Sequence, residues 1–183
     1  MINVALLGFG RIGQMHAQNI YLNKTLNLLY VYEKIDKLGK KAKYLYNCKI
    51  EKNYKKIFSD EKVDIIFISS PTNTHIRFIE EGIKYNKTIF CEKPLDLNIN
   101  KIVKTFKKVK KNNSKIQMGF NRRFDPSHHS IKKDLEKGKI GRLEKIIITS
   151  RDPAPPSKTY LRSSGGIFLS LIHISEPTRL RSI

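Results

Sequence analysis

Short apolar segments alternate with longer amphipathic segments between residues 3 and 120 of this 183-residue chain. Apolar runs such as VDIIFISS are continuous, which suits strands of a sheet that is covered on both faces. The longer segments repeat apolar residues three or four positions apart, a spacing that indicates helices. Regular alternation of strand and helix predicts an α/β fold with a parallel, doubly wound sheet.

We expect strands at 3–8, 26–33, 63–70, 88–94 and 115–120, helices at 11–22, 36–47, 74–86 and 98–113, and a short helix or loop at 52–61. In the first helix, Ile12, Met15 and Ile20 are expected to face inward. After residue 119 the rhythm changes to a helix at 126–141 and a strand at 142–152. The expected organisation is one domain over 1–118 and the incomplete start of a second domain over 119–169.

The formal net charge is +20, and most of the excess comes from lysine. In the densest stretch, KTFKKVKKNNSK, the lysines lie above apolar residues at helical spacing, so they form the solvated face of an amphipathic helix. Those apolar residues are Ile99, Ile102, Val103, Phe106 and Val109. No zinc-finger spacing, aromatic RNA-binding pattern or recognition helix accompanies the charge, which argues against a nucleic-acid partner. A nucleic-acid binder stays a minor alternative.

The N-terminal apolar run is too short for a secretory signal, and no later run in the sequence is long enough to span a bilayer. Cys48 and Cys91 are too few for a disulfide framework or a metal cluster. We therefore expect a cytoplasmic protein with reduced thiols, no membrane partner and no metal site.

The sequence GFGRIG, residues 8–13, follows the first expected strand and opens the first expected helix. Gly8, Gly10 and Gly13 have the G-x-G-x-x-G spacing of a dinucleotide-binding loop. The first glycine allows a tight turn, the second lets the backbone approach a pyrophosphate, and the third lets the helix pack close to the sheet. The N–H groups at the start of the helix then face the anion.

An acid, Glu33, ends the second expected strand 20 residues after Gly13. Its carboxylate can accept hydrogen bonds from an adenosine ribose hydroxyl and would repel a 2′-phosphate, which favours NAD over NADP. Lys34 weakens this preference, because a cation beside the acid can tolerate the phosphate. An acid that is merely exposed at a strand end is the structural alternative.

Lys93 lies in CEKP, where another strand is expected to end, at the edge where open α/β sheets bind ligands. Pro94 fixes its own φ and favours an extended Lys93, which holds the ammonium at the mouth of the cleft. A lysine there can polarise a substrate hydroxyl or pass its proton. The alternative is that Lys93 is a surface lysine like most others in the chain. Its position at the end of a strand, and not its residue type, distinguishes it.

The segment SSPTNTH, residues 69–75, follows a third strand end and supplies hydroxyl and amide groups to the same edge. Thr74 equally fits a helix N-cap, and His75 fits a residue at the start of a helix.

Further along, GFNRRFDP brings Arg122 and Arg123 close to Asp125. This arrangement is either a structural ion pair between domains or a contact with substrate. His128 and His129 follow at the start of the next helix and are expected at the surface.

Together, VALLGFGRIGQMHA, Glu33, SSPTNTH, CEKP and MGFNRRFDP resemble the Gfo/Idh/MocA family of NAD(P)-dependent oxidoreductases. The segment SRDPAPPSKTYLRSSGGIFL is similar, more narrowly, to the inositol dehydrogenases within that family. The resemblance runs from residue 2 to about residue 169. It implies a Rossmann domain joined to an α/β domain whose open sheet packs on it and commonly mediates oligomers. Members move a hydride between a carbon of a sugar or polyol and the nicotinamide.

The resemblance also implies roles for particular residues. Lys93 would be the catalytic lysine, and Arg123 and Tyr160 would lie on the substrate side. The dinucleotide, NAD more than NADP, would be held by Gly8, Gly10, Arg11, Ile12, Gly13, Glu33, Ser70, Pro71, Thr72, Asn73, His75, Glu92 and Lys93. The implied partners are a small polyol or sugar, with inositol expected, and further copies of the full-length protein in a homo-oligomer.

After the Gly-Gly turn, the resemblance implies an Asp and, four residues later, a His that acts as general base with the lysine. This chain has Ser170 and Ile174 at those positions, and His173 is one residue out of register. Residues 170–183 contain no Lys or Asn, unlike the rest of the chain, so we expect a non-native tail after Leu169. As written, the chain is expected to bind a dinucleotide without turning over a polyol. A non-catalytic sensor module and another sugar dehydrogenase of the family are the alternatives.

Overall fold

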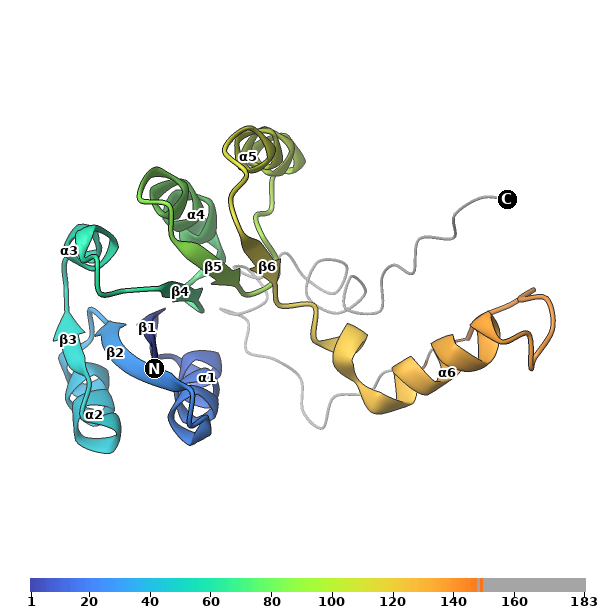
Figure 1. The fold of residues 1–183 in the computed structure, drawn as a ribbon, viewed down its shortest axis with the longest axis horizontal. Helices are drawn as coiled ribbons and strands as arrows, with labels where there is room; N and C mark the ends of the chain where they lie inside the picture. The colour runs from blue at the N-terminus through green and yellow to red at the C-terminus, as the bar shows by residue number, and fades with distance from the viewer. Residues whose placement is uncertain (148, 150–183) are drawn as a thin grey trace. The chain divides into compact units, whose positions relative to one another are not determined.

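The computed structural model of the chain describes residues 1–147 and 149. The chain divides into two compact units, residues 1–119 and 120–183. The first unit is a six-stranded parallel sheet with helices on both faces (Figure 1). The expected α/β fold with a doubly wound parallel sheet is therefore confirmed. The limit expected between 169 and 170 lies outside the described residues.

The strands of the first unit are β1 (Ile2–Leu7), β2 (Leu26–Tyr32), β3 (Lys49–Glu51), β4 (Ile65–Ile68), β5 (Thr88–Cys91) and β6 (Ile116–Met118). Its helices are α1 (Arg11–Leu22), α2 (Asp36–Tyr46), α3 (Tyr54–Ser59), α4 (His75–Lys84) and α5 (Ile99–Lys111), and a 3₁₀ turn, η1 (Thr72–Thr74), precedes α4. The sequence pattern does not predict β3, because three residues are too few to show a period.

The strands lie in the order β3-β2-β1-β4-β5-β6, and every neighbouring pair is parallel. The chain builds outward from β1 in both directions, so the strand order reverses between β1 and β4. Helices α1 and α2 cover one face of the sheet, and α3, α4 and α5 cover the other (Figure 1). The strands β1 and β4 are neighbours, and the loops that follow them lead to helices on opposite faces of the sheet. Open α/β sheets bind ligands between two such loops.

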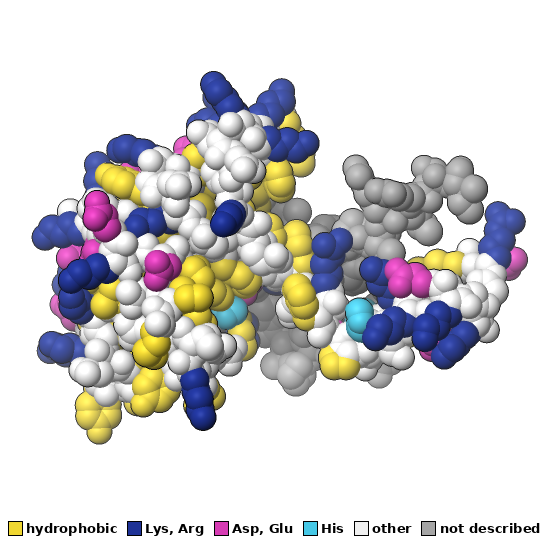
Figure 2. Space-filling model, in the orientation of Figure 1, with side chains coloured by type: hydrophobic (Ala, Val, Ile, Leu, Met, Phe, Trp, Pro, Cys, Tyr) yellow, Lys and Arg dark blue, Asp and Glu magenta, His cyan; other side chains and the backbone are white. Residues whose placement is uncertain are grey.

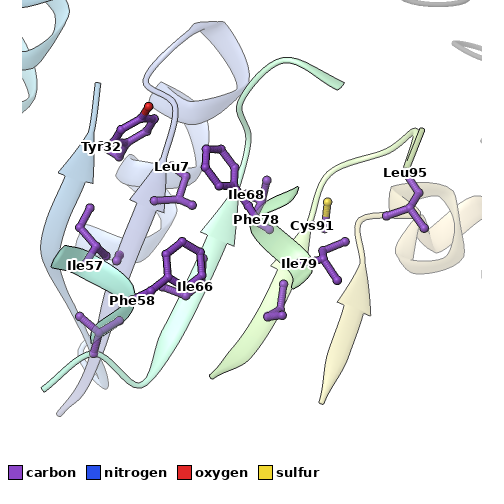
Figure 3. Close-up of a cluster of buried hydrophobic side chains, with 13 residues drawn as sticks. Leu7, Tyr32, Ile57, Phe58, Ile66, Ile68, Phe78, Ile79, Cys91 and Leu95 are labelled. Atoms are coloured by element: carbon purple, nitrogen blue, oxygen red, sulfur yellow. The ribbon is translucent and has the colours of Figure 1, made fainter. Parts of the chain in front are cut away.

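The larger core lies between the sheet and helices α3, α4 and α5, and Figure 3 shows its buried side chains against the strands. The rings of Phe58 and Phe78 stack there with their centroids 6.3 Å apart. Full burial of such a side chain favours folding by about 1.5–3 kcal/mol. The buried members are Ala5, Leu7, Tyr32, Ile57, Phe58, Val63, Ile66, Ile68, Phe78, Ile79, Ile89, Cys91 and Leu95.

The smaller core lies between the sheet and helices α1 and α2. The buried residues of α1 are Gly13, Ala17 and Ile20, whereas Met15 is 49% exposed. The expectation that Met15 faces inward is therefore wrong. The small residues at positions 13 and 17 let the helix backbone lie close to the sheet, and this turns Met15 toward solvent.

Helix α5 carries the densest lysine stretch, and its lysines lie on the surface as expected (Figure 2). Ile102 and Val109 pack against the larger core on either side of Thr105, which is 2% exposed. The apolar face of this helix is only partly covered, because the stripe that contains Thr105 is the one that meets the sheet. On this face, Ile99 is 66% exposed, Val103 is 48% exposed and Phe106 is 50% exposed.

The described part of the second unit, residues 120–147 and 149, contains a 3₁₀ turn, η2 (Asn121–Phe124), and one helix, α6 (Pro126–Glu136). Asp125 caps α6, since its carboxylate accepts the backbone N–H groups of Ser127 and His128 at 3.0 and 3.2 Å. Asp125 also pairs with Arg122 at 3.2 Å and with the His128 ring at 3.1 Å. The hydrogen bond from His128 lowers the pKa of Asp125 to about 2. Arg122 thus takes part in an ion pair within the second unit, whereas the ion pair expected from the sequence was one between domains.

The strand expected at 142–152 is not formed in its described part, residues 142–147 and 149. A strand needs a neighbouring strand to pair its backbone N–H and C=O groups. The described residues after Gly119 include no other strand that could supply this pairing. Within the described part of the chain, no helix has the length and hydropathy needed to cross a membrane.

Replacing Phe78, which is fully buried in the larger core, with Ala should lower the free energy of unfolding by about 3–5 kcal/mol, because apolar contacts are lost and a cavity remains. Phe106→Ala is the matched control, since Phe106 is 50% exposed on α5. That change should cost about 1 kcal/mol or less. Urea denaturation measures both values, and equal losses would contradict the packing described here.

Candidate functional site

The loops after β1 and β4 lie against each other at the carboxyl edge of the sheet. Ser69 directly follows β4, and its hydroxyl donates to the carbonyl oxygen of Gly8 at 2.9 Å. The Ser69 N–H donates to the carbonyl oxygen of Leu7, also at 2.9 Å. These bonds fix the glycine loop at the point where the strand order reverses.

Two of the three loop glycines are required by the protein itself. Gly8 has a φ of +97°, and a Cβ there would lie 2.8 Å from backbone atoms of Ser70. A Cβ on Gly13 would collide with the carbonyl oxygen of Gly8. Neither position accepts a side chain unless the backbone moves.

Gly10 is different, because no atom of the described residues, apart from its own chain neighbours, lies within 4 Å of a Cβ built on it. Its φ of −69° is also one that any residue adopts. Nothing among the described residues therefore requires glycine at position 10. A ligand that approaches the backbone closely at this point does require it, and a pyrophosphate group fits that requirement.

The N-terminus of α1 supplies donors for such an anion. Gly10 is the N-cap, and no side chain of the described residues caps the helix at this end. The first intrahelical bond runs from the Gln14 N–H to the Gly10 carbonyl oxygen at 2.8 Å, so the N–H groups of Arg11, Ile12 and Gly13 precede the helical bonding. The first turn, all of it described, contains no acid, so no carboxylate of the turn itself offsets the positive end of the helix dipole.

Glu33 follows the end of β2 and turns back toward the glycine loop. Its Oε2 accepts the Phe9 N–H and its Oε1 accepts the Ile35 N–H, each at 2.9 Å. The acid is thus tied to the loop and is not merely exposed at a strand end. Each carboxylate oxygen has two lone pairs, so both can still accept hydrogen bonds from ribose hydroxyls.

The loop after β4 forms a compact turn that includes η1. The Thr74 hydroxyl donates to the Pro71 carbonyl oxygen at 2.6 Å and lies 2.6 Å from the Ser70 hydroxyl. Thr74 occupies the N-cap position of α4, but its side chain makes no cap hydrogen bond because the hydroxyl is used within the turn. Pro71 and Asn73 are exposed, and Thr72 is half-buried.

His75 joins the loop after β4 to the loop after β5. It is 1% exposed, its Nδ1 lies 2.9 Å from the Pro94 carbonyl oxygen, and its Nε2 lies 2.8 Å from the Ser70 carbonyl oxygen. Burial lowers the pKa of His75, although both carbonyls and the charges of Glu92 and Asp96 act in the opposite direction. A neutral imidazole has one N–H, so in either tautomer it donates to one of the two carbonyls.

Lys93 is half-buried and lies just past the end of β5, and its peptide bond to Pro94 is cis. The Lys93 N–H donates to Oε2 of Glu92 at 3.2 Å, while Oε1 of Glu92 lies 2.8 Å from Nε2 of His16. His16 is a residue of this site that the sequence reasoning missed. Its place on the buried stripe of α1 was an available signal, but its partner lies 76 positions away, beyond any local pattern.

The structure therefore brings the expected dinucleotide and lysine positions to one edge of the first unit, where β1, β2, β4 and β5 end. Those positions are Gly8, Gly10, Arg11, Ile12, Gly13, Glu33, Ser70, Pro71, Thr72, Asn73, His75, Glu92 and Lys93. Of the two expected substrate positions, Arg123 is exposed in the second unit and Tyr160 lies outside the described residues.

The two kinds of loop glycine should respond differently to alanine. Gly13→Ala should lower the free energy of unfolding by about 1–3 kcal/mol, because the added Cβ meets backbone. Gly10→Ala should leave it within about 0.5 kcal/mol, yet weaken NADH binding by about tenfold or more, because the Cβ enters the space of the pyrophosphate. Urea denaturation and calorimetric titration give the two quantities. Tight NADH binding by a folded Gly10→Ala variant would contradict this assignment.

The buried His75 should make stability depend on pH. Since burial lowers its pKa from the ordinary 6.5, the unfolded chain binds more protons just below that pH, and the free energy of unfolding falls as the pH drops. His75→Asn should lose less stability than the wild type between about pH 7.5 and about pH 5. His129→Asn, a change at an exposed histidine of α6, should follow the wild type. Parallel curves for all three proteins in urea denaturation would contradict the sign or the site of this effect.

Comparison with known proteins gives close relatives. Inositol 2-dehydrogenase of Rhizobium meliloti (strain 1021) is 36% identical over 167 residues, which are 91% of this chain and 50% of that protein. The crystal structure of a myo-inositol dehydrogenase from Corynebacterium glutamicum matches with a TM-score of 0.87 and 35% identity over 96% of this chain and 53% of that one. A scyllo-inositol dehydrogenase from Lactobacillus casei, solved with NAD(H) and scyllo-inositol, matches with a TM-score of 0.74 and 30% identity over 77% of this chain and 42% of that one.

The chain spans about half the length of the curated relatives it matches. The family model described as "Oxidoreductase family, NAD-binding Rossmann fold" matches residues 2–120, which include the whole parallel sheet. The chain belongs to this family of oxidoreductases, Gfo/Idh/MocA.

Proposed function

We propose that this chain is the dinucleotide-binding part of an NAD-dependent dehydrogenase that oxidises a hydroxyl-bearing carbon of a small polyol, with inositol as the expected substrate. The open space at Gly10, directly before the uncapped N-terminus of α1, carries this proposal. The described residues have no steric need for glycine at that position, whereas a pyrophosphate bound there would have one.

Two groups would hold the adenosine and pyrophosphate portions of NAD. The N–H groups of Arg11 and Ile12 would donate to the pyrophosphate, assisted by the dipole of α1. Glu33 would accept hydrogen bonds from the ribose hydroxyls with the lone pairs that the loop leaves unused. Its charge would oppose a 2′-phosphate, which favours NAD over NADP.

The nicotinamide would lie toward the loops after β4 and β5. Thr72 and Asn73 belong to the first of these loops and Lys93 to the second. NAD, when bound, supplies the hydride acceptor. The Lys93 ammonium would lie beside the substrate hydroxyl, where its charge favours loss of the hydroxyl proton and stabilises the developing alkoxide.

The choice of polyol rests on the relatives and on one segment of the sequence. The relatives compared above are inositol dehydrogenases by name, and one was solved with scyllo-inositol. The segment SRDPAPPSKTYLRSSGGIFL, which carries the narrower resemblance, lies outside the described residues. Another sugar dehydrogenase of the same family is the alternative within the enzyme class.

A specific feature favours a second candidate, a dinucleotide-binding module without catalysis. Ser170 and Ile174 occupy the positions where the resemblance implies an Asp and the general base. Hydride transfer is slow when no general base accepts the hydroxyl proton. We therefore propose that this chain, taken alone, binds NAD without rapid polyol oxidation.

The cytoplasmic location and the homo-oligomer of the full-length protein belong to the same proposal. Cys48 and Cys91 are free and buried, and burial raises the pKa of both thiols, that of Cys48 to about 11. Such thiols stay protonated and unreactive, which fits a reducing compartment. The homo-oligomer rests on the family resemblance.

The chain should bind NADH more tightly than NADPH, as measured by the change in NADH fluorescence on titration. Glu33→Gln should reduce this preference by about tenfold, because it removes the charge that repels the 2′-phosphate, while its one remaining oxygen can accept only one of the two backbone N–H groups. Glu51→Gln is the matched control, since Glu51 ends β3 and its Oε1 accepts the Asn53 N–H at 2.8 Å, the same local contact that Glu33 makes with Ile35.

Failure of the wild type to bind NADH would overturn the proposed function. An unchanged preference in Glu33→Gln, or an equal change in Glu51→Gln, would overturn the role of Glu33 alone.

A further inference from the structure

Two histidines reach the loop that carries Lys93 from opposite faces of the sheet. Side chains along a strand alternate between the faces. In β5, Cys91 belongs to the larger core on the α4 side, whereas Phe90 and Glu92 contact His16 of α1. We name residues 92–94 the EKP loop.

His16 holds the EKP loop from the α1 side. Its Nε2 lies 2.8 Å from Oε1 of Glu92, and the side chains of the two residues are 13% and 18% exposed. The imidazole also packs against Phe67 and Phe90, with ring centroids 5.1 and 5.4 Å away. The second oxygen of the same carboxylate accepts the N–H of Lys93 at 3.2 Å. His16 thus fixes a carboxylate that in turn fixes the backbone of the lysine.

In the tautomer whose proton is on Nδ1, His75 holds the EKP loop from the α4 side. Its Nδ1 lies 2.9 Å from the carbonyl oxygen of Pro94, the residue directly after Lys93. Its Nε2 faces Ser70, in the loop after β4, at 2.8 Å. The side chain is 1% exposed, so its contacts are with protein and not with solvent.

We propose that His16 and His75 are positioning residues for Lys93, holding the residue before it and the residue after it so that the ammonium faces the dinucleotide. This inference rests on the proposed function, in which Lys93 acts beside the nicotinamide. Neither imidazole touches the reacting atoms. A lysine side chain is long and flexible, so fixing the backbone on both sides limits the positions that its nitrogen can take.

The two imidazoles act through different ring nitrogens, which permits a crossed test. The side-chain amide nitrogen of Gln reaches about as far as Nε2 of His, and that of Asn reaches about as far as Nδ1. His16→Gln therefore keeps the contact with Glu92, and His16→Asn loses it. The pattern reverses at His75, where Asn keeps the contact with Pro94 and Gln keeps the contact with Ser70.

The readout is the rate at which an amine-specific acylating ester modifies Lys93 in the free, full chain at constant pH, followed by peptide mass spectrometry. His16→Asn and His75→Gln should raise this rate by about threefold or more, because the EKP loop opens more often. His16→Gln and His75→Asn should stay within about twofold of the wild type. The same two changes at His129, which is exposed on α6, are the controls and should have no effect.

If the two histidines only stabilised the fold, the acylation rate of Lys93 would follow the thermal stability of each variant, whether it carries Asn or Gln. That result would overturn the inference. The reversed preference for Gln and Asn at the two positions is the supporting result. If a loosened variant at one histidine does not fold, the pair of variants at the other histidine decides the test.

NADH serves as the second probe. It should protect Lys93 from acylation in the wild type and in the two retaining variants, and less in the two loosened ones. A wild type that does not bind NADH overturns the proposed function, while the crossed pattern in the free chain still tests the positioning of Lys93. Normal NADH binding together with equal acylation rates in all folded variants would overturn only the positioning role of His16 and His75.

Discussion

The close approach of the glycine loop to the loop after β4 is the constraint on which the rest of the site depends. Gly13 lies against the carbonyl of Gly8, and Gly8 lies against the backbone of Ser70, so neither has room for a side chain. This packing fixes where α1 begins and which face it turns to the sheet. The same rotation that exposes Met15 brings His16 within hydrogen-bond distance of Glu92. The close packing of these glycines thereby links the N-terminus of α1 to the EKP loop.

The site contains glycines that the packing of the protein requires and one that it does not, and its loops are joined by the side chains of Glu33 and His75. Gly8 and Gly13 serve the protein's own packing, while Gly10 leaves space that the described residues do not use. Glu33 and His75 each bridge two segments, the first between the glycine loop and the end of β2, the second between the loops after β4 and β5. Hydrogen bonds within the protein thus hold these loops together at one edge of the sheet.

Much of the fold follows from local patterns, because the helix and strand periods are properties of short segments. The doubly wound sheet and the glycine loop were predictable on that basis. The strand β3 was not, because Lys49–Glu51 is too short to show a period. The inward face of α1 depends on packing against the sheet, and the partners of His16 and His75 lie 5 to 76 positions away along the chain. Such contacts leave no mark on a local pattern, although the buried stripe of α1 could have drawn attention to His16.

We propose above all that the glycine loop and the EKP loop form one pocket for a nicotinamide dinucleotide. A crystal structure of the chain with NADH tests it most directly. We expect pyrophosphate oxygens within about 3 Å of the backbone nitrogens at the start of α1, and the nicotinamide ring beside the Lys93 nitrogen. A pyrophosphate bound away from Gly10, or a nicotinamide ring beyond the reach of Lys93, would contradict the account.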